Sequence, residues 1–153
     1  MAMMKMSKDF EEFLKLLSEK KVDYLLIGGY AVIHYGYVRN TGDMDIWVRS
    51  TAENTLRTAE ALDDFGYAPK EQTLTYLRQP NKILRMGVPP FRLEISTDID
   101  GVDFDDCYSR HSTLQVNQVE VSLISFDDLI KNKKASGRLK DLADVEELLK
   151  VNS

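Results

Sequence analysis

The stretch VDYLLIGGYAVIHYGYVRNTGDMDIWV, residues 22–48, decides the fold. It begins with a run of β-forming residues that stops at Gly28-Gly29, which is typical of a buried strand entering a tight turn. A short helix and then a second strand are predicted to follow. Because side chains alternate along a strand, Asp43 and Asp45 would lie together on one face of that second strand.

Each part of this segment suits chemistry at a phosphate group. Glycines at the start of a helix let backbone N–H groups approach a phosphate, which the positive end of the helix dipole also favours. An Asp-x-Asp pair on one strand face can hold Mg²⁺, which proteins usually bind through oxygen together with substrate phosphates. Two such ions, roughly 3.5–4 Å apart, stabilise both the attacking and the leaving oxygen of a displacement at phosphorus.

A third carboxylate is then expected on a neighbouring strand. The stretch FRLEIS, residues 91–96, reads as a strand with Glu94 on its polar side. Glu94 could complete a set of metal ligands or accept a proton. Asp43, Asp45 and Glu94 are therefore the predicted metal ligands and catalytic acids.

The rest of the chain predicts one domain over residues 1–153, because this length leaves little room for a second core. Helices are predicted after three capping residues, Ser7, Ser50 and Ser125, and over a last stretch from about Gly137 to Lys150. Hairpins are predicted by two pairs of β-like runs, Thr73–Arg78 with Lys82–Met86 and Thr113–Val116 with Val119–Leu123.

Composition excludes several classes of protein. Twenty basic residues against twenty-five acidic ones give a net charge of −5, which argues against nonspecific binding to a nucleic-acid backbone. The single cysteine excludes an intramolecular disulfide and a multi-cysteine zinc site. No run of apolar residues is long enough for a signal-peptide core or a membrane span, so we expect a cytoplasmic protein without a membrane partner.

These segments together resemble the polymerase-beta-like nucleotidyltransferase superfamily, in which a Gly-Gly or Gly-Ser turn precedes an Asp-x-Asp strand and a later strand adds a third acid. The matching stretches are LIGG at 26–29, RNTGDMDI at 39–46 and RLEI at 92–95. The tail LIKNKKASGRLKDLAD, residues 129–144, is similar to the closing segment of small bacterial members, including those related to abortive-infection nucleotidyltransferases. One departure is Gly29, where many members carry Ser.

The resemblance implies an α+β fold with a small mixed β-sheet flanked by helices. It also implies transfer of a nucleoside monophosphate from a nucleoside triphosphate, such as ATP, to an acceptor hydroxyl, with release of pyrophosphate. Two Mg²⁺ ions would lie on Asp43, Asp45 and Glu94. Gly28 and Gly29 would cradle the outer phosphates.

Further residues could line the nucleotide side of the site. By the same resemblance, these are Lys134, Arg138 and Asp141, although their helical spacing also suits surface ion pairs. Arg39 and Thr41 could bind phosphate, and Thr41 could equally form a local turn hydrogen bond.

The acceptor stays open between RNA, a protein and a small hydroxylated compound, and the net acidity disfavours a long nucleic acid. The chain lacks the helical domain appended to larger members, so a helical partner protein is expected to supply what that domain supplies there. The alternative function is a noncatalytic nucleotide-binding or partner-binding module, for example one half of a toxin–antitoxin or regulatory pair.

Overall fold

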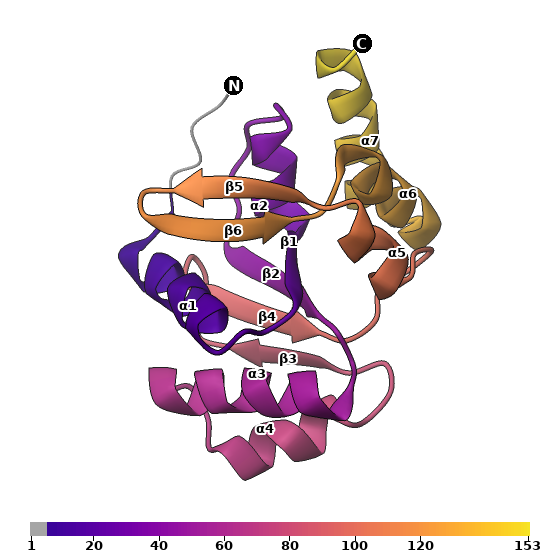
Figure 1. Cartoon of the computed structure of the whole chain (residues 1–153). Helices are drawn as coiled ribbons and strands as arrows, with labels where there is room; N and C mark the ends of the chain where they lie inside the picture. Colours follow the sequence, from indigo (N-terminus) through magenta and orange to yellow (C-terminus); the bar gives the residue numbers. More distant parts are fainter. Residues whose placement is uncertain (1–5) are drawn as a thin grey trace.

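The computed structural model describes residues 6–153, which form an α+β fold with six strands and seven helices (Figure 1). The strands are β1 (Tyr24–Ile27), β2 (Asp43–Val48), β3 (Ile83–Met86), β4 (Arg92–Ser96), β5 (Ser112–Val116) and β6 (Val119–Leu123). The helices are α1 (Lys8–Glu19), α2 (Gly28–His34), α3 (Ala52–Phe65), α4 (Lys70–Leu77), α5 (Phe104–Ser109), α6 (Phe126–Ser136) and α7 (Leu139–Val151).

All six strands belong to one mixed sheet, in the order β3-β4-β2-β1-β6-β5. The β2 strand runs parallel to β4 on one side and antiparallel to β1 on the other. The two strands that carry the predicted acids are therefore direct neighbours inside the sheet. The expected small mixed sheet flanked by helices is confirmed.

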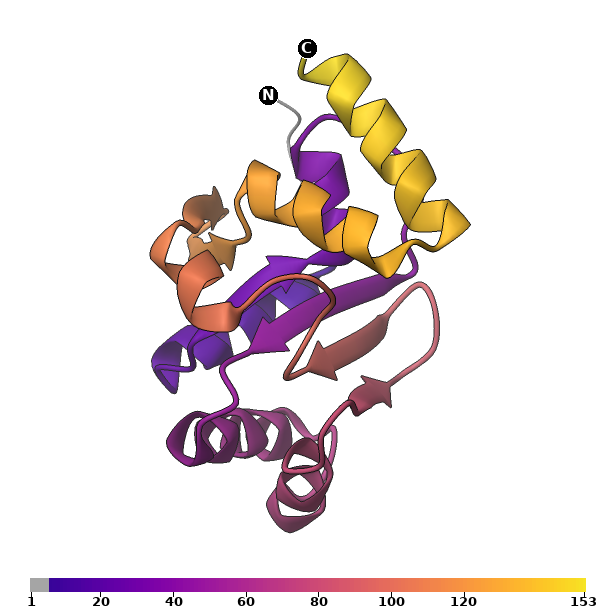
Figure 2. The same ribbon diagram turned by 90° about the vertical axis from the view of Figure 1, so that its right-hand side faces the viewer.

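Helices cover both faces of the sheet. Figure 2 shows α6 and α7 together on one side of the central strands, with α3 and α4 on the other. The α1 helix buries one apolar face made of Phe10, Phe13, Leu14 and Leu17, as its spacing predicts. Its start is capped as expected, since the Ser7 hydroxyl accepts a hydrogen bond from the Phe10 backbone N–H at 3.2 Å.

The prediction of a strand over Thr73–Arg78 is wrong, because these residues lie almost wholly in α4. Thr73 and Leu77, one helical turn apart, are the buried residues of this short helix. The β-branched and aromatic residues suggested a strand, but packing against α3 and β3 overrides that weak local preference. The β3 strand pairs instead with β4, so the first predicted hairpin does not form, whereas the second, β5 with β6, is confirmed.

Two further boundaries differ from the sequence-based expectations. The cap of α3 is Thr51 and not Ser50, because the Thr51 hydroxyl accepts from the Asn54 backbone N–H at 3.3 Å. The last helix begins at Leu139, since Gly137 adopts a left-handed conformation with φ of 68° and ends α6. The short helix α5, in an acidic stretch, was not predicted.

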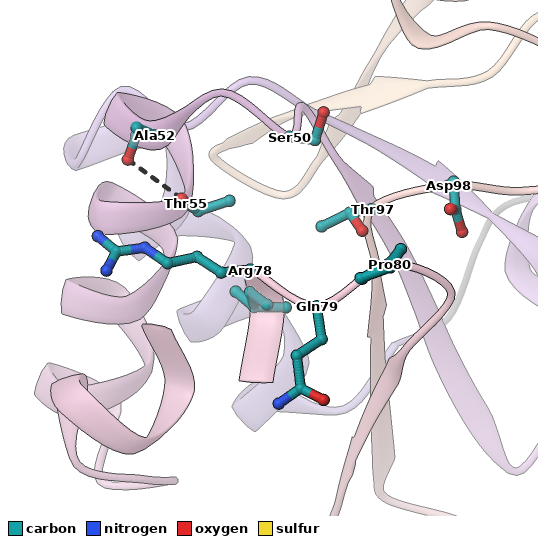
Figure 3. A pocket seen from close by; sticks show the side chains of 9 residues that line it. Ser50, Ala52, Thr55, Arg78, Gln79, Pro80, Thr97 and Asp98 are labelled. Atoms are coloured by element: carbon teal, nitrogen blue, oxygen red, sulfur yellow. Dashed lines mark hydrogen bonds between the residues drawn. The ribbon is translucent and has the colours of Figure 1, made fainter. Parts of the chain in front are cut away.

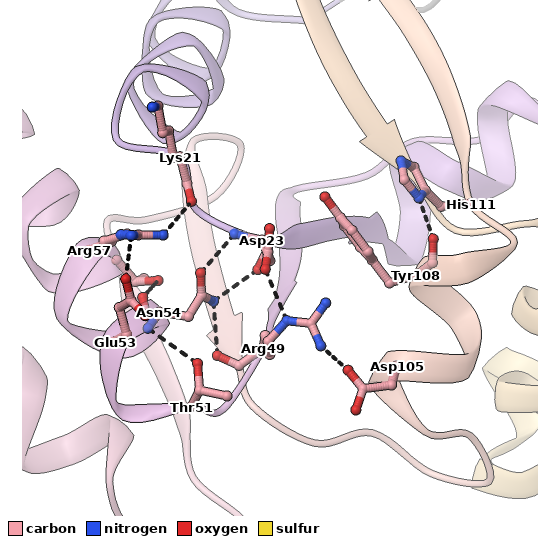
Figure 4. Close-up of polar contacts among 11 residues, drawn as sticks. Lys21, Asp23, Arg49, Thr51, Glu53, Asn54, Arg57, Asp105, Tyr108 and His111 are labelled. Carbon is pink, nitrogen blue, oxygen red and sulfur yellow. Dashed lines mark hydrogen bonds and ion pairs between the residues drawn. The ribbon is translucent and has the colours of Figure 1, made fainter.

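A buried asparagine fixes the start of β1 against the end of β2 (Figure 4). The Asn54 side-chain oxygen accepts from the Asp23 backbone N–H at 2.7 Å, and its amide donates to the Asp23 and Arg49 carbonyls at 3.0 and 2.9 Å. The Arg49 guanidinium also pairs with the carboxylates of Asp23 and Asp105. These contacts set the antiparallel register in which Ile27, at the other end of β1, lies opposite Asp45.

Within residues 6–153, none of the helices has the length and apolar character needed to cross a bilayer.

Candidate functional site

The three predicted acids lie on one face of two neighbouring strands. In the parallel register of β2 and β4, Asp45 lies opposite Glu94 and Asp43 lies opposite Arg92. Met44, between the two aspartates, is fully buried and points the other way. Strand alternation therefore places both aspartates on the face that also carries Glu94, as the sequence predicts.

The Gly28-Gly29 turn packs directly against these acids. A Cβ atom on Gly28 would lie 2.0 Å from Asp45 Oδ2, and Gly28 has a φ of +68°. A Cβ on Gly29 would lie 2.4 Å from Thr41 Oγ1. Only glycine fits at either position, and the close approach leaves the backbone of the turn bare beside the Asp45 carboxyl.

The position of Thr41 accounts for glycine at position 29. The Thr41 hydroxyl donates a hydrogen bond to the Asp43 carbonyl at 3.1 Å and fills the space that a side chain at position 29 would need. A serine there would collide with it. A hydroxyl group is thus present beside the turn, although it comes from the segment before β2.

The Asp45 carboxyl is difficult to ionise. Burial, together with the neighbouring carboxyls of Glu94 and Asp43, raises the pKa of Asp45 to about 8, while the charge of Lys133 opposes the rise. A carboxyl with such a pKa is mostly protonated at neutral pH. Asp45 and its two acidic neighbours, Asp43 and Glu94, therefore do not all carry a negative charge at neutral pH.

Two arginines neutralise the other two acids. Arg92 forms a forked pair with Asp43, with Nε at 2.8 Å from Oδ1 and Nη2 at 2.9 Å from Oδ2. Arg85 Nε lies 2.9 Å from Glu94 Oε1. Across the described part of the chain, no three acidic, histidine or cysteine side chains converge on a point that could hold a metal ion.

The residues nevertheless fit a divalent cation in kind. Three carboxylates on adjacent strands are hard oxygen ligands of the type that Mg²⁺ prefers. The bare backbone of Gly28 lies directly beside the Asp45 carboxyl. Both oxygens of Asp43 are occupied by Arg92 in this structure.

A second charged cluster, in α6 and α7, lies near the acid cluster that Asp43, Asp45 and Glu94 form. Lys133 is buried, and its Nζ lies 2.9 Å from Asp141 and 3.0 Å from Asp144. Asp144 also accepts a forked pair from Arg39, at 2.9 and 3.0 Å. Arg39 Nη1 lies 3.5 Å from the place of a Gly29 Cβ, so this cluster borders the glycine turn.

The structure brings some of the predicted tail residues to this cluster and leaves one outside. Asp141 belongs to it: burial opposes ionisation, but bonds from Ser136 and Lys133 hold the pKa of Asp141 below its ordinary value. Arg138 is largely exposed and contacts Asp141 at 3.0 Å. Lys134 is exposed, and its neighbour Lys133 has the buried position.

Sequence reasoning missed Lys133, Asp144 and the two arginines on β3 and β4. Asp144 follows Asp141 by three residues, which puts both on one face of α7 and was a usable signal. Lys133 could have been preferred over Lys134 only with the position of α6 known. The pairing of Arg92 with Asp43 depends on the β2–β4 register, which the sequence does not specify.

A separate hollow lies away from the acids (Figure 3). Its lining includes Ser50, just after β2, and Thr97, just after β4, together with Arg78 and Gln79 beyond α4. These positions follow the carboxyl ends of the two strands, whereas Asp43 and Arg92 begin them. The hollow is therefore at the opposite end of the strands from the acid cluster.

No protein-family model matches the chain, and no curated protein matches it. Solved structures share its fold, among them the following three. The lincosamide antibiotic adenylyltransferase LnuA, with lincomycin bound, superposes with a TM-score of 0.57 at 20% identity, over 94% of this chain and 96% of that one.

The other two structures are similar over most of this chain. A putative nucleotidyltransferase from Thermotoga maritima gives a TM-score of 0.60 at 14% identity, over 92% of this chain and 90% of its own. An antigenic nucleotidyltransferase-like protein from Paracoccidioides brasiliensis gives 0.53 at 15% identity, over 92% and 73%. At these identities the likeness establishes architecture, and the chain has a nucleotidyltransferase-like α+β fold.

Proposed function

We propose that this protein transfers a nucleoside monophosphate from a nucleoside triphosphate to an acceptor hydroxyl and releases pyrophosphate. The observation that carries the proposal is the packing of the Gly28-Gly29 backbone against Asp45, which itself lies opposite Glu94. A phosphate-binding turn beside a cluster of carboxylates is the arrangement that metal-assisted attack at phosphorus requires. The nucleotidyltransferase-like fold supports the same chemistry.

The acids have the central roles in this proposal. Asp43, Asp45 and Glu94 hold Mg²⁺, which when bound supplies Lewis-acid stabilisation of the charge on the transferring phosphate and its leaving group. Glu94 also orients the acceptor hydroxyl and accepts its proton. Glu94 is paired with Arg85, whose side chain is 55% exposed.

The surrounding groups bind the triphosphate. The bare N–H groups of the glycine turn and the Thr41 hydroxyl contact its outer phosphates. Arg39 and Lys133, both held by Asp144, add positive charge beside the turn. Asp141 and Arg138 support Lys133 from the start of α7.

The first acceptor to test is a small hydroxylated compound, and the first nucleotide is ATP. The fold neighbour LnuA is an adenylyltransferase of lincosamide antibiotics, and this chain covers nearly all of its length. The net charge of −5 also disfavours a long RNA acceptor.

The test is transfer of label from each of four α-labelled nucleoside triphosphates, with Mg²⁺, into a fractionated cell extract. Asp45→Asn is the control, because asparagine matches the shape of the protonated aspartate and keeps the fold. We expect label in one fraction with the wild type only, and that fraction identifies the acceptor as small molecule, protein or RNA. Equal labelling by Asp45→Asn would contradict the proposal.

The alternative, a noncatalytic nucleotide-binding or partner-binding module, is favoured by one observation: Asp43 and Glu94 are both paired with arginines. Such a module would bind nucleotide and yet transfer nothing. Nucleotide binding that is unchanged in Asp45→Asn, together with no label transfer by the wild type, would establish this alternative.

A further inference from the structure

We infer that Arg92 is an internal counter-cation that occupies Asp43 in the free protein, so that a divalent cation gains this ligand only when Arg92 leaves it. The inference rests on the proposed function, since it concerns the same acids. It predicts that the protein binds the cation weakly in the absence of a polyphosphate and tightly together with one.

The contact uses the whole of the Asp43 carboxylate. The Arg92 guanidinium donates from Nε and Nη2 to the two oxygens, at 2.8 and 2.9 Å. Such forked, charge-assisted pairs are among the stronger contacts that a carboxylate makes. The oxygens of Asp43 cannot keep both bonds and at the same time coordinate a cation at full strength.

The backbone holds the two residues in place for this contact. They lie opposite each other in the β2–β4 register, and the Arg92 backbone N–H donates to the Gly42 carbonyl at 3.3 Å. Their side chains remain 33% and 26% exposed, respectively. The pair is therefore accessible to solvent and can exchange partners without unfolding of the sheet.

The three acids differ in their ion pairs: within the described part of the chain, Asp43 and Glu94 contact arginines, and Asp45 does not. Arg92 Nη2 lies 3.6 Å from Glu94 Oε1, and Arg85 contacts that same oxygen. Asp45 has no ion-pair partner among residues 6–153. A cation that approaches Asp45 therefore meets one carboxylate that is free of arginine and two that are not.

A phosphate group offers Arg92 a replacement partner. A guanidinium binds phosphate oxygens with the same forked geometry that it uses for a carboxylate. When a triphosphate lies on the glycine turn, Arg92 can exchange Asp43 for a phosphate while the cation takes Asp43. Loss of the Arg92–Asp43 pair and gain of the cation then occur in one binding event.

The experiment measures the affinity of Mn²⁺ alone, by electron paramagnetic resonance of the free ion, in the absence of nucleotide. Arg92→Met keeps the length of the side chain and removes its charge. We expect it to bind Mn²⁺ about tenfold more tightly than the wild type, because one charge-assisted pair no longer competes. Arg92→Lys, which keeps the charge but loses the fork, should fall between the two.

Two controls make the result specific. Arg57→Met removes one positive charge from an exposed pair on α3, Arg57 with Glu53, and should leave Mn²⁺ affinity unchanged. In an Asp43→Asn background, Arg92→Met should have a much smaller effect, because only the longer contact of Arg92 with Glu94 is then lost. Equal tightening by Arg57→Met, or a full effect of Arg92→Met without Asp43, would overturn the inference.

The inference and the proposed function fail in different ways. If Arg92→Met binds Mn²⁺ no more tightly than the wild type, while the wild type still transfers label, the inference alone is wrong. If the wild type transfers no label from any nucleotide and Asp45→Asn does not weaken Mn²⁺ binding, the proposed function is wrong.

Discussion

Asp45 combines a buried position, two acidic neighbours and direct contact with the glycine turn. Its pKa is about 8 in the fold, against an ordinary value of 3.8. Between these two values the folded protein binds more protons than the unfolded chain. The contribution of Asp45 to the free energy of unfolding is therefore largest at low pH and is lost as the pH rises toward 8.

This argument gives a prediction for the metal-free protein. Between about pH 5 and pH 9, in a chelating buffer, the wild type should lose more stability than Asp45→Asn, whose amide does not titrate. Urea unfolding of both proteins across this range measures the difference. Parallel stability curves would show that Asp45 is not the strained carboxyl that the structure indicates.

A second prediction concerns Gly28, and Gly66 provides a matched control. Both have positive φ, at +68° and +88°, but a Cβ on Gly66 meets nothing within 4 Å. Gly66→Ala should cost about 1 kcal/mol of stability through backbone strain alone. Gly28→Ala should cost at least about 2 kcal/mol, because its methyl group also collides with Asp45, and it should lose nucleotide transfer.

Chemical denaturation and the label assay together check this pair of variants. Equal destabilisation by the two substitutions would mean that the turn has room beside Asp45. Full transfer activity in Gly28→Ala would separate the turn from the reaction.

At the scale of single residues, the sequence predicts acids far better than their counter-ions. The Asp43–Asp45 pair follows from strand alternation, which is local. Arg92 reaches Asp43 only through the pairing of β2 with β4, which joins residues 49 positions apart, and Arg85 reaches Glu94 through the pairing of β3 with β4. A pattern within one strand carries no information on such partners.

At the scale of elements, α6 and α7 show that the helical spacing of apolar residues does not predict which charged side chains are buried. Gly137 separates them, and the buried face of α7 contains Asp141 and Asp144 as well as Val145 and Leu148. Leu142 and Leu149 of the same helix are exposed. The helix turns acids inward because Lys133 and Arg39 meet them there.

This arrangement predicts opposite results for two adjacent lysines. Lys133→Met should destabilise the protein by about 3 kcal/mol, because Asp141 and Asp144 lose a buried partner, and should raise the KM for nucleotide. Lys134→Met should change stability by less than about 0.5 kcal/mol and leave that KM unchanged. Urea unfolding and steady-state kinetics on both variants give the comparison.

The contrary result is equally informative. If Lys134→Met raises the KM and Lys133→Met does not, the lysine expected from the sequence is the one at the nucleotide, and the Lys133 cluster is only structural.

The mistaken strand over Thr73–Arg78 has a related cause. Helix α4 buries two of its eight residues, so its periodicity is too weak to outweigh β-forming residue types. In α1 and α3, capping residues and a longer apolar face agree with each other, and the prediction of both helices is confirmed.

Over the whole molecule, the order of the strands brings three distant segments together. The acids of β2 and β4 lie close to the glycine turn after β1 and to the ends of α6 and α7, although these segments span more than a hundred residues. The α+β class was expected from the resemblance to nucleotidyltransferases. The strand order β3-β4-β2-β1-β6-β5 was not, because it depends on long-range pairing.

If a nucleotide with Mg²⁺ binds at the acid cluster, the ligand stabilises the native state by mass action. At about a hundred times the Kd, ATP with Mg²⁺ should add about 2.7 kcal/mol and raise the Tm by roughly 5–10 °C. Asp43→Ala should abolish the shift, whereas Asp105→Ala, which removes an exposed acid near Arg49, should keep it. A shift that survives in Asp43→Ala would place the nucleotide elsewhere.

Nucleotidyl transfer at the acid cluster is tested most directly by comparing α-labelled with γ-labelled ATP, in the presence of Mg²⁺ and the acceptor that the fractionation identifies. Label from the α position should enter the acceptor, label from the γ position should leave as pyrophosphate, and Asp45→Asn should do neither. Transfer of γ-label to the acceptor, or α-label transfer that persists in Asp45→Asn, would contradict the assignment of this chemistry to Asp43, Asp45 and Glu94.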